Sequence, residues 1–122
     1  MTMSASVRMM VEIAGLDSDD INFPIKFDVS DPTTFTMQRR IQAVADTEES
    51  LDLGGVSTIE LVIIKAITND MLIDCDFTST FDADLSVEEG TAQVFKPEGT
   101  VKIINKDAGV QCTYLYIVIG TT

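Results

Sequence analysis

Apolar and polar residues alternate with a period of two along much of the chain, as in β-strands with one buried and one solvated face. The clearest stretch is Ile21 to Ser30, in which every second residue from Ile21 to Val29 is apolar. Pro24 cannot donate a backbone hydrogen bond, so we expect this strand at a sheet edge or its proline at a bulge. A similar alternation over Ser6 to Ile13 predicts a strand before it.

Further strands follow from the same pattern and from the turn residues between them. They are predicted over Thr33–Asp46, Thr58–Ile67, Met71–Phe77, Leu85–Val87, Ala92–Phe95, Thr100–Ile104 and Val110–Ile119. The middle of Thr58–Ile67 is apolar on both faces, which predicts a central strand or one that packs against another subunit. Gly54-Gly55 and Gly109 stand where the chain can turn through a left-handed conformation.

Short strands separated by turn signals roughly every 8–12 residues are typical of an all-β sandwich or barrel. We therefore predict a single β-sandwich of about eight or nine antiparallel strands. It would span residues 1–122, with a possible N-terminal arm over about residues 1–6. The one helical candidate is a short turn near Thr47.

The chain is strongly acidic, with 20 acidic and 8 basic residues and a net charge of -12. Nucleic acids and anionic membrane surfaces both attract Lys and Arg and repel an acidic protein. We therefore expect no nucleic acid and no membrane as a partner, and we expect protein surfaces instead. The segment Met1–Val11 lacks the apolar core of a signal peptide, which predicts synthesis and folding in a cytoplasm.

The sequence contains no His, which removes the most common general base, the Ser-His-Asp and Cys-His arrangements and ordinary zinc sites. Cys75 and Cys112 lie on separate predicted strands and are interpreted as small buried apolar residues in a reducing compartment. Tyr114 and Tyr116 are expected in the core with their hydroxyls near its rim. We predict no catalytic residue, no metal ligand and no cofactor, and hence no enzyme.

Carboxylates are the remaining candidates for chemistry. Four of them could supply the carboxylate pair of a hydrolase: Asp74, Asp76, Asp82 and Asp84. Asp74 and Asp76 are predicted on the solvated face of their strand, where acidic residues usually keep a protein soluble. Calcium takes oxygen ligands, and the places to look for it are the turn Asp17–Asp20 and the loop Asp46–Asp52, although the EF-hand pattern is absent.

The second half of the chain combines several features in a fixed order. The segment Ser50–Val56 (SLDLGGV) enters an apolar strand, Asp70–Phe77 forms a second strand, Leu85–Gly90 is a Leu-x-x-x-x-Gly turn, and Tyr114–Ile119 ends the series. In this order of strands and turns, residues 49–122 resemble small virion proteins of tailed bacteriophages. The resemblance implies a jelly-roll or related β-sandwich that decorates or cements a capsid, or a head–tail or tail accessory protein.

The resemblance also implies where such a protein acts. It would be made in the host bacterial cytoplasm and end in the virion, with the major capsid protein or other virion proteins as partners. It would form a homo-oligomer, with a trimer favoured. Partner contacts are expected from the N-terminal arm and an acidic loop, at Met3, Ser4, Val7, Glu48, Glu49 and Asp52.

Two other functions stay open at this point. A non-viral binding module, such as a carbohydrate-binding sandwich, would need exposed aromatic residues on a flat face, and the absence of Trp counts against it. A carboxylate-based hydrolase would need the aspartates named above to act in pairs.

Overall fold

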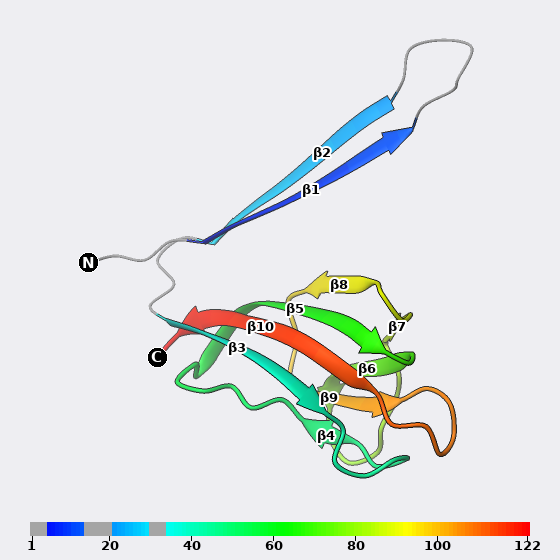
Figure 1. The fold of residues 1–122 in the computed structure, drawn as a ribbon. Helices are drawn as coiled ribbons and strands as arrows, with labels where there is room; N and C mark the ends of the chain where they lie inside the picture. Colours follow the sequence, from blue (N-terminus) through cyan, green and yellow to red (C-terminus); the bar gives the residue numbers. More distant parts are fainter. Residues whose placement is uncertain (1–4, 14–20, 30–33) are drawn as a thin grey trace.

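The computed structural model describes residues 5–13, 21–29 and 34–122 of the chain. Every regular element in these ranges is a β-strand, and all strand pairs are antiparallel (Figure 1). No helix able to span a membrane occurs among them. The predicted all-β class is therefore confirmed for the described part of the chain.

Eight strands form two four-stranded sheets. One, called here the β10 sheet, has the order β3 (Thr34–Ile41), β10 (Thr113–Thr121), β5 (Thr58–Thr68), β8 (Ala92–Phe95). The other, the β9 sheet, has the order β4 (Glu49–Ser50), β9 (Thr100–Asn105), β6 (Met71–Phe77), β7 (Leu85–Val87). Successive strands mostly alternate between the sheets, which is the wrapped order of a jelly roll.

The core lies between the two sheets and is formed by the inward side chains of both. The β10 sheet contributes Val62, Ile64, Ala66, Tyr114, Tyr116 and Val118, and the β9 sheet contributes Met71, Ile73, Val87, Val101 and Ile103. Leu51, Val56 and Cys112 complete this cluster from the adjoining segments. Because residues two apart share a face of a strand, the alternation seen in the sequence becomes one continuous apolar layer.

The predicted central strand is confirmed. β5 lies between β10 and β8 in its sheet, so its backbone is hydrogen-bonded on both sides. Its pairing with β10 shifts register at Gly120, where the two backbones come very close. A Cβ added at Gly120 would lie 1.9 Å from the carbonyl oxygen of Thr58 and 2.8 Å from Cγ1 of Val56. Only glycine fits this position.

Turns occur where the sequence indicated them. Gly54, Gly90 and Gly109 all have positive φ, as does Asn69 in the sharp connection from β5 to β6. The region near Thr47 contains turns and bends and no helix. Its Asp46 also has a positive φ of 65°, a conformation that Asp and Asn tolerate better than most residues do.

A buried amide network fixes this turn to the end of β9. Asn105 accepts hydrogen bonds from the side chain of Gln42 (2.9 Å) and the backbone N–H of Asp46 (2.7 Å). Its amide nitrogen donates to the carboxylate of Asp46 (2.8 Å) and the carbonyl of Asp107 (2.7 Å). Gln42 and Asn105 are buried, so these bonds satisfy groups that would otherwise be costly in the interior.

Both tyrosines behave as predicted. Tyr114 and Tyr116 are fully buried and their rings stack with centroids 5.8 Å apart. The hydroxyl of Tyr116 donates to the carbonyl of Asp52 at 2.8 Å, and that of Tyr114 donates to Glu49 at 3.4 Å. Cys112 is buried and Cys75 is half-buried, and neither forms a disulfide.

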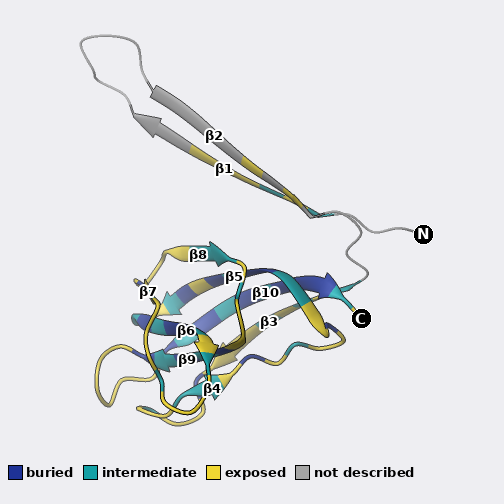
Figure 2. Cartoon of the chain, turned by 180° about the vertical axis from the view of Figure 1, so that it is seen from behind, coloured by how far each residue is buried: buried dark blue, intermediate teal, exposed yellow. Residues whose placement is uncertain are grey.

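The first two strands do not join either sheet of the sandwich. β1 (Ala5–Ile13) and β2 (Ile21–Val29) pair only with each other, as a two-stranded antiparallel hairpin. In both views this hairpin lies apart from the sandwich (Figures 1 and 2). We expected one sandwich over residues 1–122, whereas both of its sheets lie within residues 34–121.

The hairpin explains why Pro24 is tolerated in a strand. In a two-stranded sheet each strand is an edge, so a residue without an N–H group removes no bond from a central ladder. Pro24 pairs with Met10 in an uninterrupted register, which confirms the edge position. The expected arm at residues 1–6 lies outside the described residues except for Ala5 and Ser6, which open β1.

Candidate functional site

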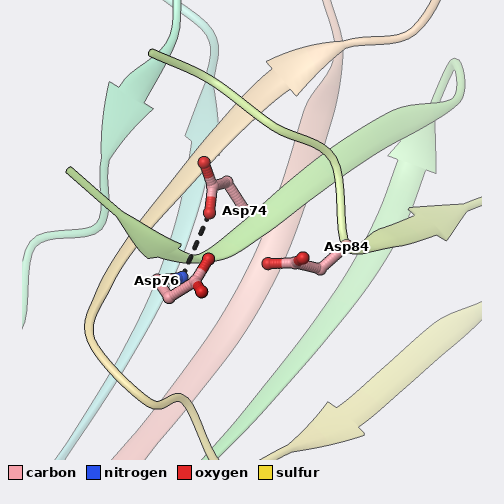
Figure 3. Close-up of side chains that lie close together, drawn as sticks. All are labelled: Asp74, Asp76 and Asp84. Carbon is pink, nitrogen blue, oxygen red and sulfur yellow. Dashed lines mark hydrogen bonds between the residues drawn. The ribbon is translucent and has the colours of Figure 1, made fainter. Parts of the chain in front are cut away.

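Three aspartates gather where β6 ends. Asp74 and Asp76 belong to β6, and Asp84 lies just before β7, after a loop that returns over the end of the strand (Figure 3). One carboxylate oxygen from each of the three lies within 4.8 Å of the others. Asp74 and Asp76 are two residues apart on β6, the spacing at which residues share a face of a strand. The pairing of β6 with β9 is irregular between Asp74 and Phe77.

Asp74 is buried, so its predicted place on a solvated face is wrong. The residue is 1% exposed. Its carboxylate accepts hydrogen bonds from the backbone N–H groups of Asp76 (3.1 Å) and Asp82 (2.9 Å). Burial by itself raises the pKa of a carboxyl group, but these two backbone donors outweigh it and hold the pKa of Asp74 below its usual value. The charged form of Asp74 thus fixes the loop between β6 and β7.

Asp76 shows the opposite behaviour. It is exposed, and its pKa is raised by its hydrogen bond with Asp74 and by the nearby charge of Asp84. The carboxylate of Asp84 accepts from the backbone N–H of Cys75 at 2.8 Å. Burial and the charges of these carboxylates raise the pKa of the Cys75 thiol to about 11. The thiol is therefore protonated at neutral pH and is a poor nucleophile.

The aspartate cluster offers hard oxygen ligands of the kind that Ca²⁺ prefers. However, both oxygens of Asp74 already accept backbone bonds. The cavity beside it, about 570 Å³, is lined mainly by polar residues of the loop 78–82, unlike the apolar pockets that usually bind small molecules. The carboxylates are also closer than the separation of about 5 Å or more in glycosidases. The geometry favours a role in holding the loop.

The carboxylates of Asp46 and Asp52, in the loop that was the second expected place for calcium, accept hydrogen bonds from other groups of the chain. Asp46 accepts bonds from Asn105 and from the backbone of Gly109, and these bonds lower its pKa. Asp52 accepts a bond from the backbone N–H of Gly54, which lowers its pKa. Among the described residues, the aspartates at β6 are the one group close enough to share an ion. The turn Asp17–Asp20 lies outside the described residues.

Replacing these aspartates with asparagine is expected to have opposite effects. Asp74→Asn should lower the free energy of unfolding by about 2 kcal/mol at pH 7, because the amide turns an NH₂ group toward a backbone donor. Asp76→Asn should raise it slightly, because the change removes the repulsion that raises the pKa of Asp76. Urea unfolding curves of the two variants and the unmodified chain measure both effects.

The pH dependence gives a second check with a defined sign. Asp74 has a lowered pKa, so its contribution is present above the ordinary value of 3.8 and is lost as the pH falls below it. Asp76 has a raised pKa, so the gain from Asp76→Asn should diminish as the pH falls through that raised pKa and should be absent below 3.8. Equal losses of stability in both variants at pH 7 would contradict this account.

A second candidate site is the outer face of the β10 sheet, the face turned away from the core. Its apolar side chains form continuous rows across neighbouring strands. One row crosses all four strands, with Met37 opposite Ile117, Ile117 opposite Ile63 and Ile63 opposite Val94. A second row joins Phe35, Ile119 and Leu61. This apolar outer face is defined by Phe35, Met37, Ile41, Leu61, Ile63, Ile67, Val94, Leu115, Ile117 and Ile119.

The edge strand β3 is the most exposed part of the apolar outer face. Phe35 and Met37 are each 56% exposed and Ile41 is 66% exposed. The opposite face of β3 carries Thr36 and Gln38, which are half-buried. Thr36 and Gln38 thus point toward the sandwich, whereas Phe35, Met37 and Ile41 point toward solvent beside Arg39. This is the reverse of a strand that serves only its own core. Apolar residues gathered in this way mark contact sites.

The residues predicted to touch partners are spread over different parts of the molecule. Met3 and Ser4 lie outside the described residues, and Val7 is half-buried in β1. Glu49 and Asp52 make internal bonds to Tyr114 and Gly54, and Glu48 is half-buried beside them. The apolar outer face was not among these predictions. The sequence feature that could have indicated this face is the presence of apolar residues on both faces of Thr58–Ile67 and of the last strand.

No protein-family model, curated protein or solved structure matches this chain.

Proposed function

We propose that this chain is a non-enzymatic structural protein that acts by protein–protein assembly, in a phage virion and most specifically as a capsid decoration or cement protein. The observation that carries the proposal is the apolar outer face, which crosses all four strands of the β10 sheet. A monomer gains nothing from exposing Phe35, Met37 and Ile41 to water, whereas an assembly buries them.

The fold and the charge support the same proposal. Jelly rolls occur in viral capsid proteins, in lectins and in cupins, and the fold alone does not select among these. The sequence has no His for the metal site of an enzyme and no Trp for a sugar platform. Phe35 is the one aromatic residue among the exposed large apolar side chains of the described part of the chain. Assembly needs neither kind of site.

Cementing a capsid fits the energetics of this surface. Each contact of a small apolar face is modest, but repetition around a lattice turns modest affinities into strong overall binding. The net charge of -12 suits an outer surface and opposes contact with packaged DNA. A homotrimer at a three-fold position on the major capsid protein is the arrangement that we propose.

The experiment is a measurement of the protein in purified virions of the phage that encodes it. Quantitative mass spectrometry should detect the chain as a stoichiometric component, in a fixed ratio to the major capsid protein. Particles that lack it should lose capsid integrity at lower temperature than complete particles. Virions that contain none of the chain would refute the proposed role, and a few copies per particle would assign it to the head–tail connection or tail instead.

A further inference from the structure

The hairpin formed by β1 and β2 has its own apolar face. The register pairs apolar residues with apolar residues at every second position: Ala5 with Val29, Val7 with Phe27, Met9 with Ile25, Val11 with Phe23 and Ile13 with Ile21. The positions between them pair Ser6 with Asp28, Arg8 with Lys26, Met10 with Pro24 and Glu12 with Asn22. Residues two apart share a face of a strand, so the register places these ten apolar positions on one face of the ribbon.

Such a hairpin is not stable by itself. An isolated pair of strands is at best marginally stable in water and needs another layer against its apolar face. In both views the hairpin lies apart from the sandwich of its own chain (Figures 1 and 2), and Met9, on the apolar face, is 38% exposed. The covering layer therefore has to come from elsewhere.

The apolar outer face of the β10 sheet has matching dimensions. Each hairpin strand has nine residues, about 30 Å of extended chain. The strands that carry most of the outer face, β3, β10 and β5, have eight, nine and eleven residues. Both surfaces are faces of antiparallel sheets with mostly apolar residues at alternate positions, and sheets pack face to face about 10 Å apart.

We propose that the hairpin of one copy packs its apolar face against the apolar outer face of the β10 sheet of a second copy. The inference rests on the proposed function and identifies the contact between subunits. Each chain carries one donor and one acceptor surface, and they differ from each other, so the contact is head-to-tail. Contacts of this kind form a ring when the rotation between copies closes, as the proposed trimer requires. In a closed ring no hairpin and no outer face stays uncovered.

Each contact is modest in size. It joins ten apolar positions of one hairpin to an outer face of ten apolar residues, of which Leu61 and Ile119 are already largely buried. Stable interfaces of standard size involve roughly 20–30 residues on each side. Each copy in a closed ring takes part in two such contacts, one through its hairpin and one through its outer face, and the ring is held by both.

Adjacent methionines on opposite faces of β1 supply a matched test. Met9 lies on the apolar face and Met10 on the other, and both are exposed. In the full chain, Met9→Asp should raise the dissociation constant at least tenfold by sedimentation equilibrium, since it places a carboxylate in the contact. Met10→Asp should change it less than threefold. Equal effects of the two changes would overturn the inference.

A mixing experiment tests whether the hairpin of one chain binds the outer face of another chain. Met9→Asp chains retain an intact outer face, and Met37→Asp chains retain an intact hairpin. Each variant alone should be monomeric, and an equimolar mixture should form a one-to-one complex through the remaining intact pair of surfaces. A mixture that stays monomeric overturns the inference, as does a monomeric unmodified chain.

The outcome also distinguishes this inference from the proposed function. If Met37→Asp weakens association and Met9→Asp does not, the outer face binds something other than the hairpin. The inference then fails and assembly through the outer face stands. If the chain is absent from virions and the mixture of variants still forms the one-to-one complex, the proposed function fails and the inference stands.

Discussion

Replacing Gly120 with alanine is expected to lower the free energy of unfolding by about 3 kcal/mol or more. The added methyl group would lie 1.9 Å from the carbonyl oxygen of Thr58, well inside contact distance. That oxygen belongs to the backbone beside a strand pair and cannot rotate away as a flexible side chain could. The register shift between β10 and β5 at this point would have to open, which separates the two central strands of the sheet.

Gly55→Ala is the matched control for this change. A Cβ at Gly55 would meet only the hydroxyl oxygen of Thr34, at 3.9 Å, and Gly55 has no positive φ. Its stability should stay within about 0.5 kcal/mol of the unmodified chain. Thermal or urea unfolding of both variants measures the difference, and a Gly120→Ala protein as stable as Gly55→Ala would contradict the close approach at Gly120.

Asn105→Ala is expected to cost about 3 kcal/mol of stability. The change removes four hydrogen bonds made by one side chain. It leaves the backbone N–H of Asp46 without this acceptor and the buried amide of Gln42 with one of its two acceptors, the carbonyl of Thr47. An unsatisfied buried polar group costs more than the net value of the bond it lost. The turn that holds Asp46 at positive φ should loosen as a result.

A surface amide serves as the control for Asn105. Gln93 donates one exposed hydrogen bond to the carbonyl of Ser86 at 3.2 Å, so Gln93→Ala should cost less than about 0.5 kcal/mol. Native-state hydrogen exchange would add a local measurement, since Asn105→Ala should lower protection at the N–H groups of Asp46 and Gly109. Equal stability of the two variants would show that the buried network contributes little.

The sequence predicts the sandwich well because its core depends on a local signal. Period-two alternation placed Tyr114 and Tyr116 inward, and glycines at positive φ marked the turns at Gly54 and Gly109. The central position of β5 followed from apolar residues on both of its faces. Each of these features is decided within a few neighbouring residues, so the pattern is visible before the fold is known.

Other features depend on contacts between distant residues. Asp74 looked like a solvated residue, and it is buried because a loop ending at Asp84 returns over β6 and supplies backbone donors. The hairpin strands have the same alternation as core strands, and periodicity cannot show which layer an apolar face packs against. For the same reason the apolar rows on β3 and β10 became visible only when the strand register joined them.

The central claim is that the apolar outer face of the β10 sheet drives assembly, and sedimentation equilibrium of two double variants tests it most directly. Phe35→Asp with Met37→Asp alters the outer face, and Val44→Asp with Val110→Asp alters two exposed apolar residues in loops. Circular dichroism would check that both remain folded. We predict that the unmodified chain and the loop variant sediment as the same oligomer and the outer-face variant as a monomer. One mass for all three proteins would contradict the claim.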